Sequence, residues 1–206
     1  MKICILDYKM GNLHSIVNSI KFLGYDPLIT NNSKDLINAD KIILPGVGSF
    51  NQAIENIKHL DLFNCLVDLC KNEKKIFLGI CLGMQVLFSL GHENFLTKGL
   101  DLVKGEVKIM ELDLNEYKIP HIGWNKVFIK KENILFNNLP YDEGIFFYFL
   151  HSFHVVPFDK KIITSTFKYS NQYVASIEYN NIFATQFHPE KSQKQGIEII
   201  KNFLQY

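Results

Sequence analysis

The chain has 206 residues, of which 47% are hydrophobic and 21% are charged, enough for one globular domain with a sizeable core. Its formal net charge is +1, which gives no long-range attraction to nucleic acid or to an anionic membrane. All 22 basic residues are Lys, so no guanidinium can hold a carboxylate or phosphate by two parallel hydrogen bonds. We therefore expect a single domain over residues 1–206, with no nucleic acid and no membrane as partner.

The cysteines and the N-terminus bear on the compartment. The first residues are too briefly apolar for a signal peptide, and the apolar stretch 76–90 is too short to cross a bilayer. The four cysteines have neither a secretory context nor metal-ligand spacing. We expect a cytoplasmic protein with reduced thiols, no metal and no cofactor, in which Cys81 is the one cysteine with a chemical role.

The first half of the chain alternates between short apolar runs and helical patterns. Strands are predicted at 2–7, 26–30, 41–44 and 76–80, and helices at 12–22, 33–38, 49–58, 61–72 and 82–90. Gly24 is expected to end the first helix, and Asp61 to cap the fourth. Strands that alternate with helices at this spacing predict a doubly wound, mostly parallel α/β sheet.

The second half is rich in β-branched and aromatic residues. These form runs at 106–112, 126–129, 144–150, 162–167, 174–178 and 182–187, separated by turn-like pairs such as Asn180-Asn181. We expect them to add antiparallel or mixed strands to the sheet, and a helix at 192–204 to close the chain.

One cysteine lies in a pattern typical of a nucleophile. The segment Gly79-Ile80-Cys81-Leu82-Gly83 stands between a predicted strand and a predicted helix, as in a nucleophile elbow. Such a turn needs small neighbours, places the cysteine at a helix N-terminus that favours the thiolate, and aims the Leu82 N–H at a developing oxyanion. A buried structural cysteine between close-packed glycines is the alternative that this segment alone leaves open.

A histidine and a carboxylate follow near the C-terminus, in Gln186-Phe187-His188-Pro189-Glu190. Residues two apart on an extended segment project to the same face, and Pro189 discourages a helix, so His188 and Glu190 are expected side by side. A carboxylate sets the tautomer of the imidazole and stabilises its protonated form. Alone, a His beside a Pro is more often a turn residue. Together with Cys81, the pattern predicts a Cys-His-Glu triad.

A glycine-rich loop, Pro45-Gly46-Val47-Gly48, follows the strand predicted at 41–44. In an α/β sheet such a loop lies at the edge where ligands bind, and its glycines permit a peptide flip that offers an N–H to an oxyanion. A phosphate-binding loop is the alternative, but its Lys-Ser/Thr ending is missing here.

These segments, with Met84-Gln85 after the elbow, resemble the class I (triad) glutamine amidotransferases. The resemblance implies hydrolysis of glutamine to glutamate and ammonia through a γ-glutamyl thioester on Cys81. His188 would be the general base and acid, and Glu190 would orient it. The implied oxyanion and substrate-binding residues are Gly46, Val47, Gly48, Leu82, Gln85, His151, Ser152 and Phe153.

Further segments narrow the resemblance. Met84, where related synthases carry His, the loop 45–48 and the segments 120–125, 148–152 and 188–192 are similar to those of the amidotransferase subunits of imidazole glycerol phosphate synthases. That similarity implies a heterodimer in histidine biosynthesis, in which ammonia passes to a separate (β/α)8-barrel cyclase subunit. It also implies slow glutamine hydrolysis until the partner binds, with reorientation of the 46–48 backbone as the switch. The implied partner-facing residues are Asn12, Trp124, Asn125, Tyr148 and Lys191.

Two departures from the family pattern keep alternatives open. Lys9 stands where a small residue is common, close to the expected interface, and Phe153 stands where Tyr is common. The same triad also serves subunits that feed a cyclase-like barrel in surface-sugar amination, and Lys9 makes this the main alternative. A cysteine hydrolase or peptidase of related fold, and a catalytically inactive binding module, are less favoured.

Overall fold

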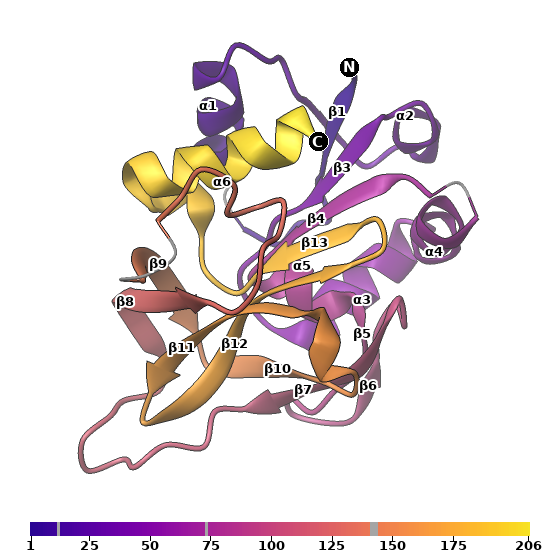
Figure 1. Ribbon diagram of the computed structural model, residues 1–206. Coiled ribbons are helices and arrows are strands. Elements are labelled where there is room, and N and C mark those ends of the chain that lie inside the picture. The colour runs from indigo at the N-terminus through magenta and orange to yellow at the C-terminus, as the bar shows by residue number, and fades with distance from the viewer. Residues whose placement is uncertain (12, 73, 141–143) are drawn as a thin grey trace.

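The computed structural model describes residues 1–11, 13–72, 74–140 and 144–206. Its first half alternates strands and helices as the sequence predicts (Figure 1). The strands are β1 (Ile3–Leu6), β2 (Leu28–Thr30), β3 (Lys41–Leu44) and β4 (Ile76–Ile80). The helices are α1 (His14–Phe22), α2 (Ser33–Ile37), α3 (Phe50–His59) and α4 (Phe63–Lys71). These strands pair in parallel, as β-α-β connections require.

The second half extends the same sheet. Its strands are β8 (His121–Ile129), β9 (Ile145–His151), β11 (Ile163–Tyr169), β12 (Asn171–Tyr179) and β13 (Ile182–Thr185). Over the described residues the order is β2-β1-β3-β4-β13-β12-β11-β8-β9. The strand β13 pairs parallel to β4, and every pair beyond it is antiparallel. The sheet is therefore mixed, and its antiparallel part is as large as its parallel part.

A smaller sheet was not predicted as a separate unit. It contains β5 (Phe88–Gly91), β6 (Thr97–Lys98), β7 (Val103–Ile109) and β10 (Phe153–Pro157), in the order β10-β7-β5-β6. The helix predicted at 82–90 is wrong beyond its first turn, because α5 covers only Leu82–Val86 and the chain then enters β5. An apolar run this short does not distinguish a buried helix from a buried strand, and pairing of β5 with β7 decides the outcome.

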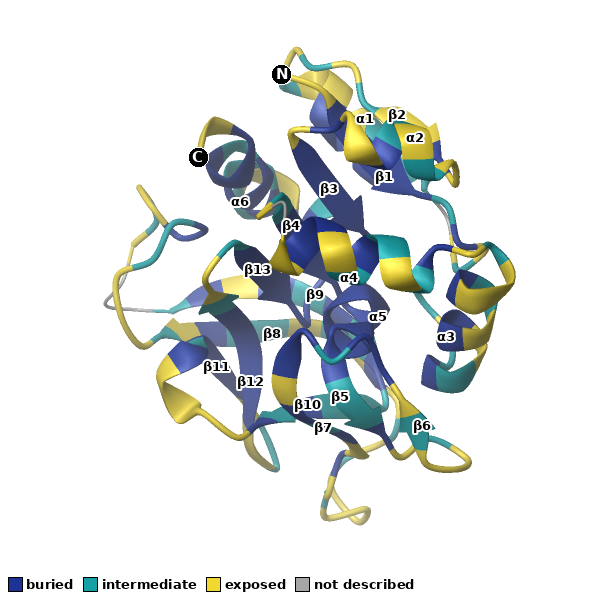
Figure 2. Cartoon of the chain, turned by 90° about the vertical axis from the view of Figure 1, so that its right-hand side faces the viewer, coloured by how far each residue is buried: buried dark blue, intermediate teal, exposed yellow. Residues whose placement is uncertain are grey.

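Helices cover both faces of the parallel part. The helices α1 and α6 (Gln193–Gln205) lie on one face, and α2 to α5 lie on the other (Figure 1). The strands between them are buried, as the dark blue of β3, β4 and β13 shows (Figure 2). The buried Lys41 donates from Nζ to the carbonyls of Phe203 (2.6 Å) and Leu204 (2.9 Å), which caps the C-terminal end of α6.

The two predicted helix-end residues had different outcomes. Gly24 adopts φ +86° directly after α1 and donates its N–H to Lys21, as expected of a glycine that ends a helix. The prediction for Asp61 is wrong: it adopts φ +54° in the turn after α3, and Leu62 occupies the N-cap of α4 without a side-chain cap. None of the described helices is both long and apolar enough to cross a membrane.

Candidate active site

The elbow at Cys81 joins β4 to α5 at the carboxyl edge of the parallel strands. Cys81 has φ +53° and ψ −107°, a strained conformation for a residue with a side chain. A Cβ on Gly83 would overlap the carbonyl oxygen of Leu44, so only glycine fits where the turn passes β3. The strain is thus held in place by close packing of α5 against the neighbouring strand.

His188 and Glu190 lie together, although not for the predicted reason. His188 is 2% exposed, and its Nδ1 is 2.8 Å from Glu190 Oε1. The segment is not extended: β13 ends at Thr185, and Pro189–Lys191 form a single 3₁₀ turn with Pro189 at its start. Proline suits the first position of a helix because its missing N–H is not needed there. The turn, rather than strand alternation, brings the carboxylate back to the ring.

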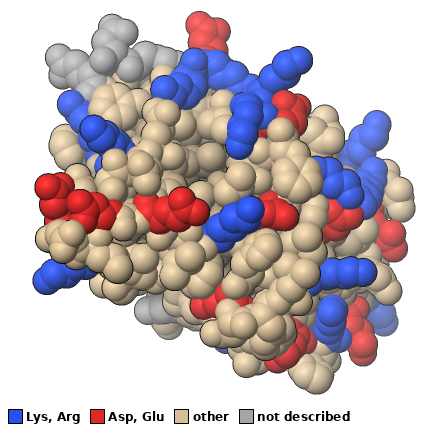
Figure 3. Space-filling view, turned by 90° about the horizontal axis from the view of Figure 1, so that it is seen from below, with Lys and Arg blue, Asp and Glu red and all other residues tan. Residues whose placement is uncertain are grey.

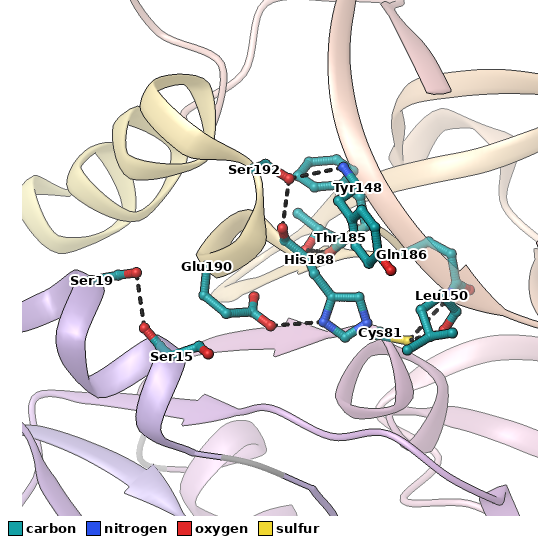
Figure 4. A network of polar contacts seen from close by, with 11 residues as sticks. Ser15, Ser19, Cys81, Tyr148, Leu150, Thr185, Gln186, His188, Glu190 and Ser192 are labelled. Atoms are coloured by element: carbon teal, nitrogen blue, oxygen red, sulfur yellow. Dashed lines mark hydrogen bonds and ion pairs between the residues drawn. The ribbon is translucent and has the colours of Figure 1, made fainter. Parts of the chain in front are cut away.

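The other ring nitrogen of His188 faces the sulfur of Cys81 (Figure 4). Burial alone would lower the pKa of His188, but the Cys81 thiolate and the Glu190 carboxylate outweigh it and raise this pKa to about 10. The Cys81 sulfur also lies 3.6 Å from the carbonyl oxygen of Leu150, to which a thiol can donate, and 3.6 Å from Gln186 Nε2. The carboxylate of Glu190, the imidazole base of His188 and the nucleophile Cys81 therefore lie in a row, in that order.

A pocket of about 420 Å³ opens beside Cys81. Its lining includes Val47, Gln85, Glu93, His151, Ser152 and Phe153. Gln85 donates from Nε2 to the carbonyl of Phe153 (2.9 Å), so both are held in one arrangement. Sequence reasoning missed Glu93, which accepts from the Phe50 N–H at 2.7 Å and brings a carboxylate to the pocket wall. It lies in the loop between β5 and β6, where no motif marks it.

A larger cavity of about 900 Å³ lies at the opposite edge of the sheet, where β4 and β13 begin, beside Cys70 and Asn181. It contains none of the residues just described. Among the residues that the structure describes, no group of three or more His, Cys, Asp or Glu side chains could hold a metal ion.

The model of the family described as glutamine amidotransferase class-I matches residues 4–206. This chain belongs to that family. The match confirms both the resemblance drawn from the motifs and the enzyme class, glutamine amidotransferase.

Two curated relatives of this amidotransferase, from different organisms, are both subunits of imidazole glycerol phosphate synthases. The imidazole glycerol phosphate synthase subunit HisH 1 of Campylobacter jejuni (strain RM1221) is 44% identical, with 98% of each chain covered. The subunit HisH of Methanocaldococcus jannaschii is 45% identical, with 98% of this chain and 97% of that one covered. Each match spans nearly the full length of both proteins.

Solved structures confirm the fold. A putative GMP synthase subunit from Thermoplasma acidophilum has a TM-score of 0.72 at 24% identity, covering 100% of this chain and 92% of that one. The structure of PurLQS from Thermotoga maritima has a TM-score of 0.75 at 18% identity, covering 100% and 98%. At these identities the likeness concerns the α/β fold with its mixed sheet.

The two expected oxyanion donors of the amidotransferase are engaged elsewhere in this structure. The Leu82 N–H donates to the carbonyl of Gly46 (3.3 Å), and the Val47 N–H donates to the carbonyl of Met10 (3.3 Å). Gly46 lies against the buried hydroxyl of Tyr8, which leaves no room for a Cβ, and Gly48 adopts φ +112°. The loop 45–48 thus closes the oxyanion position in the state described.

The predicted partner-facing residues lie in different places. Trp124 is 45% exposed and packs edge-to-face on Tyr148, with ring centroids 6.2 Å apart. The exposed Lys191 places Nζ 5.7 Å from the centroid of the Tyr148 ring, so these three form one patch. Asn125 is half-buried, and its amide donates to the carbonyl of Lys168 (3.0 Å) rather than joining the patch. Asn12 lies outside the described residues.

Proposed function

We propose that this chain is the glutaminase subunit of an imidazole glycerol phosphate synthase, with residues 1–206 acting as one cytoplasmic domain. The observation that carries the proposal is the set Cys81, His188 and Glu190 beside a pocket that fits a small amino acid. The near full-length similarity to HisH subunits supports the choice of pathway.

The proposed reaction follows from the order of the groups. His188 takes the thiol proton, and the Cys81 sulfur attacks the side-chain amide carbon of glutamine to give a tetrahedral oxyanion. Collapse breaks the C–N bond, and His188 returns the proton to the leaving nitrogen, which departs as ammonia. Water, deprotonated by His188, then attacks the thioester and releases glutamate and the thiol. Glu190 keeps the ring in the required tautomer throughout.

The substrate is proposed to lie along the pocket with its amide at Cys81. Glu93 is the acidic residue of the lining, and its charge suits the α-ammonium group of glutamine. The backbone of Ser152 and Phe153 is proposed to hold the α-carboxylate end. Gln85 lines the same space and supports this backbone, because its Nε2 donates to the Phe153 carbonyl and to Gln186 Oε1 (3.2 Å). The chain has no Arg, and the described residues that line the pocket include no Lys, so backbone N–H groups are the donors proposed for that anion.

The structure is proposed to be a resting state, because the Leu82 and Val47 N–H groups both donate to backbone carbonyls. Rotation of the Gly46–Val47 peptide would remove its carbonyl from the Leu82 N–H and turn the Val47 N–H towards the substrate. Two N–H groups would then converge on the oxyanion, an effect commonly worth about 100-fold or more in rate for each donor. We propose that the partner favours the rotated state, and that hydrolysis by the free subunit is therefore slow.

The patch formed by Trp124, Tyr148 and Lys191 is proposed to receive a (β/α)8-barrel cyclase subunit that consumes the ammonia. Exposed apolar neighbours extend it: Ile122 is 58% exposed and Phe146 is 52% exposed, on the same face of β8 and β9. Exposed aromatic residues such as Trp124 and Tyr148 are enriched in protein interfaces, whereas a lysine such as Lys191 is more typical of the polar rim. On the face seen from below, by contrast, lysines and acidic residues are intermixed (Figure 3), a distribution that does not favour nucleic acid.

The test is the glutaminase activity of the full chain with a cyclase subunit. Cys81→Ala is expected to abolish glutamate release while leaving the heterodimer intact by gel filtration. Retention of glutaminase activity in this variant, or hydrolysis of peptides but not of glutamine, would overturn the proposal. The alternative partner, a cyclase-like barrel of surface-sugar amination, is distinguished by which of the two barrels binds the chain and stimulates glutamine hydrolysis.

A further inference from the structure

Two buried histidines connect the strand that carries Trp124 to the glutamine pocket. His121 in β8 and His151 in β9 are cross-strand neighbours, and they are 3% and 6% exposed. The Nδ1 atom of His121 lies 3.3 Å from Nε2 of His151. His151 continues to the pocket, where its Nδ1 lies 2.8 Å from the carbonyl oxygen of Phe153. None of the roles proposed above uses His121.

The contacts of His121 and His151 form a hydrogen-bond chain. Its two ends fix the same proton positions independently. At the pocket end the Phe153 carbonyl can only accept, so His151 Nδ1 carries the proton and its Nε2 accepts from His121 Nδ1. At the other end, Asn125 Oδ1 accepts from the Lys126 N–H (2.7 Å), which identifies its Nδ2 as the amino group. That amino group donates to the Lys168 carbonyl and to His121 Nε2 (3.3 Å).

The hydrogen-bond chain therefore has one donor-to-acceptor direction, from Asn125 through His121 and His151 to Phe153. It requires both rings to be neutral, since a second proton on either would set two donors face to face. Burial lowers the pKa of His121 to about 4 and is the main cause that lowers the pKa of His151 to about 3, in agreement with this requirement. Aromatic neighbours hold the His121 ring, which stacks on Phe167 at 11°.

The hydrogen-bond chain ends at the Phe153 carbonyl, where the backbone passes from one sheet to the other. β9 belongs to the nine-stranded sheet and β10 to the smaller one, and Ser152 is the residue between them. The Phe153 carbonyl receives Gln85 as well as His151, and the Ser152 carbonyl accepts from the Met110 N–H (3.0 Å). With both carbonyls held, the intervening backbone has a fixed orientation in the pocket wall.

We propose that His121 and His151 are positioning residues that hold the Ser152–Phe153 backbone in the orientation that binds the glutamine α-carboxylate. The inference rests on the proposed glutaminase function. The histidines touch neither the amide nor the thiol, so their loss should weaken binding of glutamine and leave the chemical step nearly unchanged.

Paired substitutions at position 121 test the direction of the hydrogen-bond chain. In His121→Asn the amide nitrogen takes the place of Nδ1 and can still donate to His151. In His121→Gln the amide oxygen takes the place of Nε2 and accepts from Asn125, and the bond to His151 is lost. We expect KM for glutamine to rise about fivefold in His121→Gln, the effect of one net hydrogen bond, with most of this rise absent in His121→Asn. For both variants kcat, measured with the cyclase subunit present, should stay within about twofold.

A second pair and a control keep the test decisive if one variant misfolds. His151→Asn retains a donor for the Phe153 carbonyl and His151→Gln does not, so KM should again be higher in the Gln variant. His154→Gln, in β10, is the control. The ring of His154 bonds to the Val155 carbonyl (3.2 Å) and takes no part in the hydrogen-bond chain. Alkylation of Cys81 by iodoacetamide, which has no α-carboxylate, should proceed equally in all folded variants.

The outcomes separate the two proposals. Equal KM values for the Asn and Gln variants at both positions, or a fall in kcat without a change in KM, would overturn the positioning role. Failure of the unsubstituted chain to hydrolyse glutamine with its partner would instead overturn the proposed function.

Discussion

The parallel and antiparallel halves of the large sheet contribute different things to the site. The ends of the parallel strands β4 and β13 supply Cys81 and His188, the atoms proposed to react. The antiparallel strand β9 supplies the Leu150 carbonyl, and its continuation into β10 supplies the pocket wall. Cys81 is held in strained geometry by close backbone packing, whereas the segment 151–153 is held by hydrogen bonds. The first half should be sensitive to added volume, and the second to lost donors and acceptors.

The largest effect is expected at the triad, on the parallel side. In His188→Asn the base that faces Cys81 is lost, so kcat for glutamine should fall by about 10⁴-fold. Glutamate release at saturating glutamine, with the cyclase subunit present, measures this. His154→Asn, a histidine of the smaller sheet, is the matched control and should retain wild-type kcat. Comparable losses in the two variants would mean that the chemistry is not confined to the parallel strand ends.

Added volume at the elbow should have the next largest effect. A methyl group on Gly83 would overlap the Leu44 carbonyl, so Gly83→Ala should lower the free energy of unfolding by about 3 kcal/mol or more. Gly24→Ala is the control: its φ of +86° is strained for alanine, but nothing lies within 4 Å, so about 1 kcal/mol is expected. Urea denaturation of both variants measures the difference, and equal losses would contradict the role of close packing.

The parallel half was also the more predictable from sequence. β3 and β4 have the predicted bounds, and the elbow lies between a strand and a helical turn as expected. Short apolar runs followed by helical periodicity carry local signals, and parallel pairing then brings the carboxyl ends of these strands to one edge. The contact between His188 and Glu190 was anticipated, but its 3₁₀ turn was not. Pro189 was expected to discourage a helix, whereas proline is compatible with the first position of a helical turn.

The features that the sequence did not predict depend on pairing between distant segments. The strand β5 replaces a predicted helix because β7 pairs with it, and β10 forms because the chain leaves one sheet for the other after Ser152. Glu93 and the His121–His151 contact arise from loop placement and cross-strand register. A single sequence holds no local signal for register in this half, since its aromatic and β-branched residues are compatible with several alignments.

Acid should destabilise the fold through two histidines of the antiparallel half. The pKa values of His121 and His151 are lowered in the fold to about 4 and about 3, while unfolded histidine titrates near 6.5. As the pH falls below about 6.5, the unfolded state gains protons that the folded state does not, so stability decreases by about 1.4 kcal/mol per pH unit for each histidine. Denaturation between pH 7 and pH 5 should show this slope.

The matched variant for the acid effect is His121→Asn, which removes one titrating group and should reduce the slope by one proton. The comparison between the two proteins cancels the contributions of carboxylates and of the other histidines. An unchanged slope in the variant would show that His121 is not held neutral by its surroundings.

The smallest effect is expected where the two halves are joined by a hydroxyl. Ser192 is fully buried, accepts from the Tyr148 N–H of β9 at 3.0 Å, and donates to the His188 carbonyl at 2.6 Å (Figure 4). In Ser192→Ala the His188 carbonyl keeps its bond from the Lys191 N–H, but the Tyr148 N–H loses its partner. An orphaned N–H of this kind should lower the free energy of unfolding by about 1–2 kcal/mol.

A serine within one helix provides the comparison. Ser19 is also buried, and its hydroxyl donates to the Ser15 carbonyl of the same helix at 3.0 Å. That carbonyl is also an acceptor within α1, and alanine favours a helix, so Ser19→Ala should change stability by less than about 0.5 kcal/mol. Equal stabilities of the two variants would mean that the Ser192 hydroxyl does not join the halves. A loss confined to Ser192→Ala, with lower partner-stimulated glutaminase activity, would mean that the Tyr148 patch acts on His188 through this hydroxyl.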